Sequence, residues 1–530
     1  MNAIAVCSLL HELPGEGSMV RRFRGEPVLS WTMRRLALST KITRAVVLAW
    51  DDQLESLRDL DVTARACGPR LNLPGLASVT AAQRWANGWR GGLLQTCWFD
   101  NGFIGIFVRD AIRDEQADAA VLIDPAAGLI DPGIIDDLVT TAEDGAREFY
   151  FTQAAPGLGA VLAGRRIVEQ FAGTGALLGK LVHYLPDAPC LDPITNEACV
   201  PVPLEISRVA DRFTLDSDRQ IERLEQATVP LNGTLISTKA AGVVRRVSLT
   251  AYRPKLPRDI TIELTTRRNS QPIFNLASYI SITRNDMTSE QLERIIAEVS
   301  DVDDARITLA GVGDPLLHPQ AIEFISRLTK VAAVAVETDL IDTSADTLIN
   351  LAHTGLDVVA VHLPATSPAI YQRVMGVDRL ANVLENIRLL LDARRNRVAG
   401  VPIVAPVFTK LLANFDEMET WYDTWLRAVG SAVINGPSSF GGRLTGVEVA
   451  DMTPPIRREC QGIRDRIVVL SDGTIVACEQ DLTAENPLGK IDQTSLASVW
   501  AGPMKRLAEE HAALNELPTI CRQCKEWHRP

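Results

Sequence analysis

The chain has 530 residues and a formal net charge of −12, with 46% apolar and 23% charged residues. This length suffices for about two to four domains with substantial cores, and the composition is that of a globular protein. The net charge argues against a general nucleic-acid-binding protein, which usually carries a basic surface. No apolar run is long enough to predict a membrane span, and the start of the chain lacks the basic region of a signal peptide. We therefore expect a cytoplasmic protein with no nucleic-acid partner.

The first part of the chain alternates short apolar segments with segments of helix length. Residues 44–50, 119–125 and 146–152 are short and rich in β-forming residues. This alternation predicts a mostly parallel α/β sheet. A charged segment that opens at Asp216 has a capping-type start and predicts a helix that closes the domain. We place this first domain at residues 1–235.

A second alternating series follows a polar segment that contains Pro254 and Pro257. Helix-length segments again separate its apolar segments, and repeated βα units at this spacing predict a full or partial (β/α) barrel. We place this domain at residues 258–450. Its predicted strands are residues 260–266, 305–311, 331–339, 356–363 and 401–408.

Four of the nine cysteines lie after residue 459. An odd number of cysteines in a long chain fits reduced thiols and a metal site better than a disulfide framework. Apolar alternation around a Ser-Asp-Gly turn predicts a hairpin that ends at Cys478. Four thiolates suit either a [4Fe–4S] cluster or a tetrahedral zinc ion. The candidate ligands are Cys460, Cys478, Cys521 and Cys524.

The features of this segment arrive in a specific order: a hairpin with Gly473, Leu488-Gly489, Trp500 and a Cys-x-x-Cys pair. Together they resemble the SPASM domain that follows many radical-SAM enzymes, over residues 455–530. The resemblance implies that the four cysteines hold an auxiliary [4Fe–4S] cluster. Zinc and unliganded thiols are the alternatives. We expect His528 to lie at the surface or behind the ligands rather than to bind the metal, because four thiolates already complete the site.

The middle domain also resembles a known family. The segments IELTTR (262–267) and ITLAGVGDPLLHP (307–319) resemble parts of the radical-SAM barrel. In that family three cysteines after the first strand hold a cluster that chelates S-adenosylmethionine. Here the three positions are Arg268, Pro272 and Asn275, none of which ligates an iron cluster. The resemblance therefore implies a degenerate barrel, for which S-adenosylmethionine is an unlikely cofactor because no ligated iron delivers the electron.

Gly311, Gly313 and Asp314 correspond to the strand end that receives the methionyl amino group in that family. They are candidates for binding an adenosyl ligand, and the simpler interpretation is a tight turn after a strand. His318 and His362 are candidate bases at loop and strand-end positions. A lone histidine at such a position is more often structural or hydrogen-bonded to the backbone.

Residues 3–36 and 121–139 resemble cytidylyltransferase-like nucleotidyltransferases of the GT-A type. The resemblance implies that Asp124 binds Mg²⁺ with a nucleoside triphosphate, with Asp216 at a second acidic position. The alternatives are an Asp-Pro turn at the end of a strand for Asp124 and a helix cap for Asp216.

The loop that wraps the triphosphate in that family is basic, and here it contains Glu12 and Glu16. Both carboxylates would repel a polyphosphate, in a site where electrostatic stabilisation supplies most of the catalysis. Arg21, Arg22 and Arg24 lie just downstream and would replace part of the lost positive charge.

The order of the three domains is similar to that of the spiro-SPASM proteins, a group known by architecture rather than by activity. The expected fold class is α/β, with a nucleotidyltransferase-like sheet domain, a radical-SAM-like barrel and a small cysteine-rich SPASM domain. We expect an iron–sulfur protein without radical-SAM catalysis that binds a peptide, glycan or protein partner, with its cluster as a clamp or an electron relay. The alternative is a nucleotidyltransferase that activates a sugar or sugar-acid.

Overall fold

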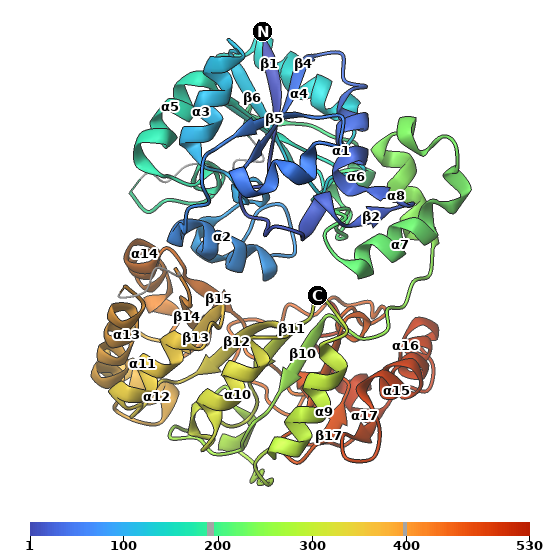
Figure 1. Cartoon of the computed structure of the whole chain (residues 1–530). Helices are drawn as coiled ribbons and strands as arrows, with labels where there is room; N and C mark the ends of the chain where they lie inside the picture. Colours follow the sequence, from blue (N-terminus) through green and yellow to red (C-terminus); the bar gives the residue numbers. More distant parts are fainter. Residues whose placement is uncertain (188–195, 396–399, 530) are drawn as a thin grey trace. The chain divides into compact units, whose positions relative to one another are not determined.

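The computed structural model describes residues 1–187, 196–395 and 400–529. The chain forms two compact units, Met1–Arg253 and Pro254–Pro530, each built on one large β-sheet with helices (Figure 1). The expected α/β fold class is confirmed. In the described part of the chain, no helix is both long enough and apolar enough to cross a membrane.

The first unit contains a seven-stranded sheet with the order β5-β4-β1-β6-β8-β7-β9. Strands β1, β4, β5 and β6 run parallel, whereas β8 runs antiparallel to both β6 and β7. The sheet is thus parallel on one side and mixed on the other. Its strands are β1 (Ala3–Ser8), β4 (Ile42–Ala49), β5 (Thr63–Ala66), β6 (Ala119–Ile123), β7 (Phe149–Thr152), β8 (Val161–Gly164) and β9 (Cys199–Val200).

Successive residues of β1 face two different cores, as the alternation of a buried strand requires. Ile4 and Val6 pack with residues of α3 and α5, whereas Ala5 and Cys7 pack with residues of α1 and α4. Helices therefore cover both faces of the sheet, and the functional candidates follow the carboxyl ends of β1 and β6. The helices of this unit are α1 (Val28–Leu36), α2 (Pro74–Arg84), α3 (Gly105–Asp114), α4 (Pro132–Asp144), α5 (Arg165–Thr174), α6 (Leu204–Ser207), α7 (Asp218–Thr228) and α8 (Ala240–Leu249).

The start of α7 corrects one expectation. The capping residue is Ser217, whose side chain accepts a hydrogen bond from the Gln220 amide, and Asp216 is not the cap. Ser217 takes this role because its backbone is extended, as a residue that precedes the first helical turn requires. Asp216 instead forms an ion pair with Arg212 at 3.2 Å. Helix α8 packs against α7, so the first unit continues beyond residue 235.

The second unit contains an open nine-stranded sheet with the order β15-β14-β13-β12-β11-β10-β16-β17-β18. Strands β10 to β15 are parallel, which is the partial form of the expected barrel. Strand β16 pairs parallel with β10, and β17 and β18 continue antiparallel, so residues 258–450 and 455–530 contribute to one sheet. The strands are β10 (Asp259–Ile262), β11 (Arg306–Leu309), β12 (Ala333–Thr338), β13 (Val358–His362), β14 (Ile403–Thr409), β15 (Val433–Asn435), β16 (Arg466–Val469), β17 (Thr474–Val476) and β18 (Gly489–Lys490).

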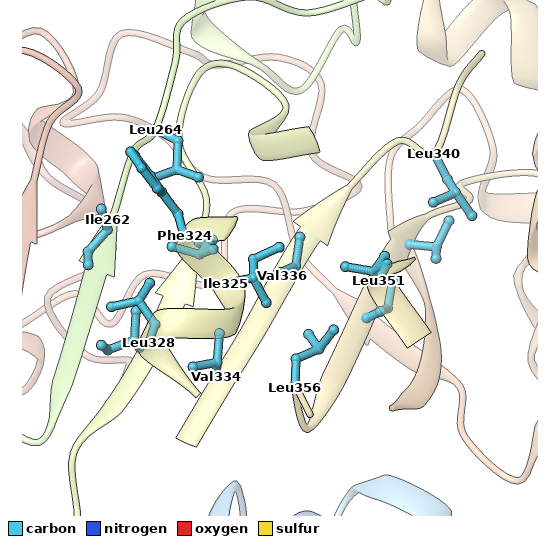
Figure 2. Packing of buried hydrophobic residues seen from close by; sticks show 14 of the residues in the cluster. Ile262, Leu264, Phe324, Ile325, Leu328, Val334, Val336, Leu340, Leu351 and Leu356 are labelled. Carbon is cyan, nitrogen blue, oxygen red and sulfur yellow. The ribbon is translucent and has the colours of Figure 1, made fainter. Parts of the chain in front are cut away.

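One face of this sheet packs against helices. Val334 and Val336 of β12 share a core with Phe324 and Ile325 of α10 (Figure 2). Because side chains alternate along a strand, Glu337 lies on the opposite face of β12. This second face carries the polar groups of the candidate sites. The helices of the unit are α9 (Ser289–Val299), α10 (Ala321–Leu328), α11 (Ala345–His353), α12 (Pro368–Met375), α13 (Leu380–Arg395), α14 (Met418–Val429), α15 (Leu496–Ala501), α16 (Pro503–Ala513) and α17 (Thr519–Gln523).

Glu263, directly after β10, joins the C-terminal hairpin to the barrel strands. Its side chain is 1% exposed and forms an ion pair with Arg284. It also accepts hydrogen bonds from the amides of Val312 at 3.1 Å and Ser471 at 3.2 Å. Since Ser471 lies in the turn between β16 and β17, one buried carboxylate fixes the hairpin that leads to Cys478.

Candidate metal centre and neighbouring polar sites

Four cysteines from three segments line one cavity of about 370 Å³ in the second unit. Cys460 precedes the 3-10 helix Gly462–Arg464, and Cys478 follows β17 at the end of the predicted hairpin. Cys521 lies in α17, and Cys524 follows that helix directly. The structure therefore brings all four sequence-predicted ligands to the same space.

The four thiols interact electrostatically. Burial raises the pKa of Cys478, and Glu479, Cys460 and Cys521 add to this effect. Burial together with Cys460 and Cys524 raises the pKa of Cys521 to about 12. A bound metal would supply positive charge that offsets these effects and favours the thiolate forms of Cys478 and Cys521.

The donor set fits a group with four thiolate ligands. Within residues 1–187, 196–395 and 400–529, no three His, Cys, Asp or Glu side chains come close enough to hold a single metal ion. The cysteines instead surround a cavity, and four cysteine thiolates are the usual ligands of a [4Fe–4S] cluster.

The end of the chain holds two of the candidate ligands, Cys460 and Cys524, in place. The Gln461 amide donates to the Trp527 carbonyl at 3.1 Å, which joins the segment of Cys460 to the chain end. The Glu526 amide donates to the Cys524 sulfur at 3.2 Å. Trp527 lines the cavity, whereas His528 is not among the described residues that line it.

Two cationic or polar side chains in the cavity were not singled out from the sequence. His511 of α16 is 1% exposed, and neither of its ring nitrogens has a hydrogen-bond partner among the described residues. Burial lowers the pKa of His511 to about 4, so the ring is neutral at pH 7. Arg457 donates through Nη1 to the Cys524 carbonyl at 3.3 Å, while its buried Nε and Nη2 atoms lack partners in the described chain. A sequence signal for the burial of His511 does exist: it lies on the same face of α16 as the apolar residues Met504 and Leu507.

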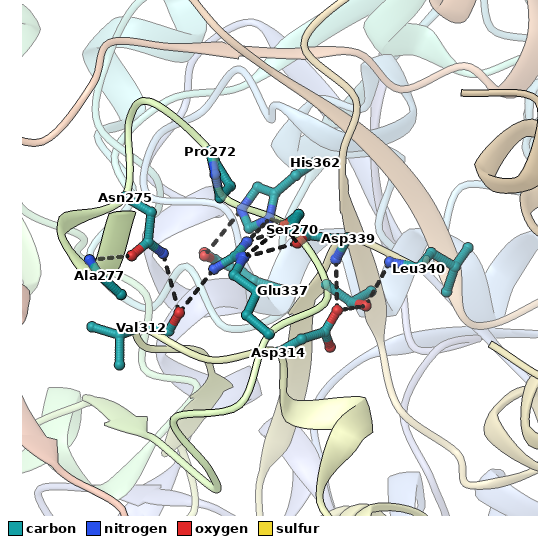
Figure 3. A network of polar contacts seen from close by, with 12 residues as sticks. Ser270, Pro272, Asn275, Ala277, Val312, Asp314, Glu337, Asp339, Leu340 and His362 are labelled. Atoms are coloured by element: carbon teal, nitrogen blue, oxygen red, sulfur yellow. Dashed lines mark hydrogen bonds and ion pairs between the residues drawn. The ribbon is translucent and has the colours of Figure 1, made fainter. Parts of the chain in front are cut away.

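A second polar site lies at the carboxyl ends of the barrel strands, where the resemblance places three cysteines (Figure 3). Arg268 donates through Nη1 to the Val312 carbonyl at 3.2 Å, and Asn275 donates through Nδ2 to the same oxygen at 3.2 Å. Pro272 lies in the same loop, where its carbonyl accepts the Asn275 amide at 2.9 Å. The three positions therefore converge around the loop after β11.

Asp339 is the centre of this network. It is 1% exposed and accepts a hydrogen bond from Arg268 Nε at 2.8 Å and another from the Ser270 hydroxyl. His362 Nδ1 lies 3.0 Å from Asp339 Oδ1. Burial alone would raise the pKa of Asp339, but Arg268 and His362 outweigh burial and lower it. Asp339 is therefore an ionised carboxylate whose charge Arg268 balances.

The three candidate adenosyl-binding residues make contacts within the fold. A side chain at Gly311 or Gly313 would collide with Glu263 or with the Thr265 carbonyl, so both glycines allow a close approach to the end of β10. Asp314 caps the short helix Pro315–Leu317 and accepts hydrogen bonds from Thr338 Oγ1 and the Asp339 amide.

The two candidate histidine bases differ. His318 is hydrogen-bonded to backbone at both nitrogens, because Nε2 contacts the Met287 carbonyl at 3.0 Å and Nδ1 accepts the Gln320 amide at 3.1 Å. His362 is fixed by Asp339 at Nδ1, and its Nε2 lies 3.8 Å from Glu337 Oε2. Glu337 also lines the cysteine cavity, so His362 lies near that cavity as well.

In the first unit, Asp124 is surrounded by protein. Its carboxylate accepts hydrogen bonds from Trp98 Nε1 and from the Ala126 amide. Burial raises the pKa of Asp124 to about 6, and the neighbouring charge of Asp216 contributes, so the two candidate Mg²⁺ ligands lie within electrostatic reach. The cavity beside Asp124 is only about 20 Å³ and is lined by Trp98 and Phe99.

The loop after β1 folds onto its own acidic residue. The Glu12 carboxylate accepts hydrogen bonds from the Ser18 amide at 3.1 Å and the Ser18 hydroxyl at 3.2 Å. Burial raises the pKa of Glu12 to about 7. Glu16 is exposed.

The three arginines of this loop also have partners. Arg21 forms an ion pair with Asp218 at 2.9 Å, and Arg22 donates to the Gly25 carbonyl at 3.0 Å. Arg24 donates to Asn232 Oδ1 at 2.7 Å. Arg21 and Arg24 are therefore directed at α7 and the segment after it, whereas Arg22 contacts its own loop.

Two family models match parts of the second unit. Residues 273–410 match the radical SAM superfamily, and residues 460–525 match SPASM, an iron–sulfur cluster-binding domain. The first match starts after Arg268 and Pro272 and includes Asn275.

Similar proteins match at low identity. An "Uncharacterized protein" of Treponema pallidum (strain Nichols) is 24% identical over 290 residues, which cover 52% of this chain and 79% of that protein. Streptococcus suis SuiB bound to precursor peptide SuiA is similar with a TM-score of 0.42 and 12% identity, over 72% of this chain and 93% of that one. A cytidylyltransferase from Leptospira borgpetersenii serovar Hardjo-bovis (strain JB197) is similar with a TM-score of 0.33 and 16% identity. The similarity covers 48% of this chain and 98% of that chain. By its two family-model matches, the second unit is similar to a radical SAM domain followed by a SPASM iron–sulfur cluster-binding domain.

Proposed function

We propose that this chain is an iron–sulfur protein that holds one [4Fe–4S] cluster and performs no radical-SAM chemistry. Cys460, Cys478, Cys521 and Cys524 are the proposed ligands, because they line one cavity and match a cluster-binding domain. When bound, the cluster supplies either a structural cross-link or a one-electron relay, since four thiolates leave no iron open to a substrate. The second unit would present this cluster to a peptide, glycan or protein partner.

The observation that carries the proposal is the ion pair of Arg268 and Asp339. It occupies the loop position where the radical-SAM family has its first cluster ligand, and the sequence has no cysteine between Cys199 and Cys460. A buried guanidinium that already balances a carboxylate offers no thiolate to iron. The superfamily name implies S-adenosylmethionine, and the proposal departs from it because this chain has no ligand set to deliver an electron to the sulfonium.

The residues of this site have definite roles. Arg268 keeps Asp339 ionised, and Asp339 holds the His362 ring through Nδ1. Asp314 fixes the turn that carries Gly313. These contacts stabilise the ends of the barrel strands.

The test is anaerobic purification of the full chain, with iron, acid-labile sulfide and zinc analysis. We expect about four irons and four sulfides per chain. Stoichiometric zinc without sulfide would contradict the cluster. The loaded protein is then incubated with dithionite and S-adenosylmethionine, and we expect no 5′-deoxyadenosine. Formation of this product above a no-protein control, and its loss in Cys460→Ala, would show that the second unit retains radical chemistry.

The alternative function, nucleotidyl transfer by the first unit, is disfavoured by the contacts of its acidic groups. Glu12 accepts the hydrogen bonds of the loop, and Asp124 faces Trp98 rather than an open pocket. Calorimetry with CTP and Mg²⁺ tests this alternative. We expect no heat of binding, and Mg²⁺-dependent binding that is weakened by Asp124→Ala would reverse the ranking of the two functions.

A further inference from the structure

The cysteine cavity contains buried hydrogen-bond donors that the fold does not satisfy. His511 is 1% exposed and has no partner on either nitrogen among the described residues. An imidazole carries at least one N–H in each of its protonation states, so His511 always presents a donor. Buried polar groups in native proteins are nearly always paired, and an unpaired one calls for an explanation such as a bound group.

Arg457 reaches the same cavity from a different segment. Its Nη1 donates to the Cys524 carbonyl at 3.3 Å, and its guanidinium lies over the Trp527 ring at 5.9 Å. These two contacts fix the guanidinium beside the candidate ligands Cys521 and Cys524. The buried Nε and Nη2 atoms have no partner in the described chain, and Arg457 lines the cavity with all four cysteines.

Packing alone does not explain why the buried residue at position 511 is a histidine. Its neighbours on the buried stripe of α16, Met504 and Leu507, are apolar, and an apolar residue at position 511 would complete that stripe without a desolvated imidazole. The group that the cysteines hold would supply the missing acceptors. Cluster sulfides and cysteine thiolates are anionic sulfur acceptors, and hydrogen bonds to them raise the reduction potential because reduction adds negative charge.

We propose that His511 and Arg457 donate N–H hydrogen bonds to the sulfur atoms of the bound cluster and hold its reduction potential high enough for it to serve as an electron relay. This inference rests on the proposed function and selects the relay over the clamp. The cluster takes up one electron from an external one-electron reductant, and no bond or proton changes in that step. His511 and Arg457 are positioning residues, since neither ligates iron.

The experiment is a redox titration of the anaerobically purified holoprotein, followed by electron paramagnetic resonance. His511→Phe and Arg457→Met remove the donors and keep similar volumes. We expect each variant to retain the iron and sulfide of the wild type while its potential becomes more negative. The expected change is at least tenfold in the oxidised-to-reduced ratio at fixed potential, about 59 mV for a one-electron couple. His511→Gln retains an N–H donor and should recover part of the shift.

The matched control is His353→Phe, because His353 is an exposed histidine on α11 of the same unit. This variant should titrate like the wild type. A second readout is resonance Raman spectroscopy in D₂O, in which we expect the iron–sulfur stretching bands of the wild type to shift and those of His511→Phe to shift less.

The outcomes separate the inference from the proposed function. A wild-type protein without acid-labile sulfide overturns the cluster itself. A normal cluster with unchanged potentials in both His511→Phe and Arg457→Met overturns the hydrogen bonds and indicates that water or packing satisfies the donors. If His511→Phe does not fold, His511→Gln and Arg457→Met decide the inference, because unchanged spectra and potentials in both would contradict it.

Discussion

The mouth, which is the polar site around Asp339 at the carboxyl ends of the barrel strands, and the cysteine cavity belong to the same unit but differ in how their polar groups are hydrogen-bonded. At the mouth, Arg268, Ser270 and His362 all hydrogen-bond to one carboxylate (Figure 3). In the cavity, His511 lacks any partner in the described chain. The side chains bonded to Asp339 thus satisfy one another, whereas the cysteine cavity keeps buried donors that have no partner in the described chain.

The first unit contains a second closed site. Glu12 accepts the hydrogen bonds of its own loop, and Asp124 accepts those of Trp98 and Ala126. The cavity that remains there is about 20 Å³, compared with about 370 Å³ at the cysteines. The cysteine cavity is therefore much the larger of these two cavities.

The largest expected effect is loss of the cluster in Cys521→Ala/Cys524→Ala. Removing two of four thiolates leaves too few ligands for a cubane cluster. Iron and sulfide should fall to near zero, and the brown chromophore should disappear, as measured by absorption and metal analysis. Cys199→Ala, which removes a partly buried thiol in the first unit, is the control and should retain full iron. A double variant that keeps its iron would place the cluster elsewhere.

The second prediction concerns a variant that disrupts the hydrogen-bond network around Asp339. Arg268→Met leaves Asp339 as a buried charge without its counterion, which should cost about 3–5 kcal/mol of unfolding free energy. Urea unfolding of the second unit measures this loss. The loss should shrink at low pH, because protonation of Asp339 removes the unpaired charge.

The control for this variant is Arg388→Met. Arg388 forms an ion pair with Glu385 at 2.6 Å on the surface of α13, and such an exposed pair adds little to stability. Its melting temperature should match that of the wild type. If Arg268→Met is also as stable as the wild type, the ion pair of Arg268 and Asp339 does not stabilise the mouth.

Local sequence patterns were sufficient to predict five strands of the second unit and the hairpin that ends at Cys478. Alternating apolar segments identified β10 to β14, and the Ser-Asp-Gly turn identified the hairpin that ends at Cys478. The pairing of β16 with β10 was not predictable, because register between distant strands depends on tertiary contacts such as Glu263 with Ser471.

The sequence also did not reveal which polar side chains find hydrogen-bond partners within the fold. The resemblance placed Arg268 where the radical-SAM family has a cysteine, but only the fold shows that Asp339, far along the chain, balances its charge. Similarly, Glu12 was expected to repel a polyphosphate, and only the structure shows that its carboxylate is bonded to Ser18 of its own loop. His511 was not singled out from the sequence, because burial without a partner is a property of three-dimensional packing.

The third prediction concerns the pH dependence of the first unit. Burial raises the pKa of Glu12 from 4.5 to about 7, so the folded state holds this proton more tightly than the unfolded state. Stability is then fully present below pH 4.5 and falls as the pH rises through this window towards 7. Since one pKa unit is worth about 1.4 kcal/mol, the loss is about 3 kcal/mol. Glu12→Gln should flatten the melting temperature between pH 4.5 and 7, and an unchanged slope would mean that other buried acids such as Asp100 dominate.

The smallest expected effect comes from His362, and it tests whether the mouth is closed on all sides. Its Nδ1 contacts Asp339 at 3.0 Å, but Arg268 and Ser270 remain bonded to that carboxylate when the ring is removed. His362→Leu should therefore cost about 1.5 kcal/mol, the value of one hydrogen bond to a charged group, compared with about 3–5 kcal/mol for Arg268→Met. Thermal unfolding of both variants and of their combination measures the difference, and the combined loss should fall below the sum because the two residues share one partner. A His362 variant as unstable as Arg268→Met would show that the imidazole, rather than the guanidinium, keeps Asp339 in place.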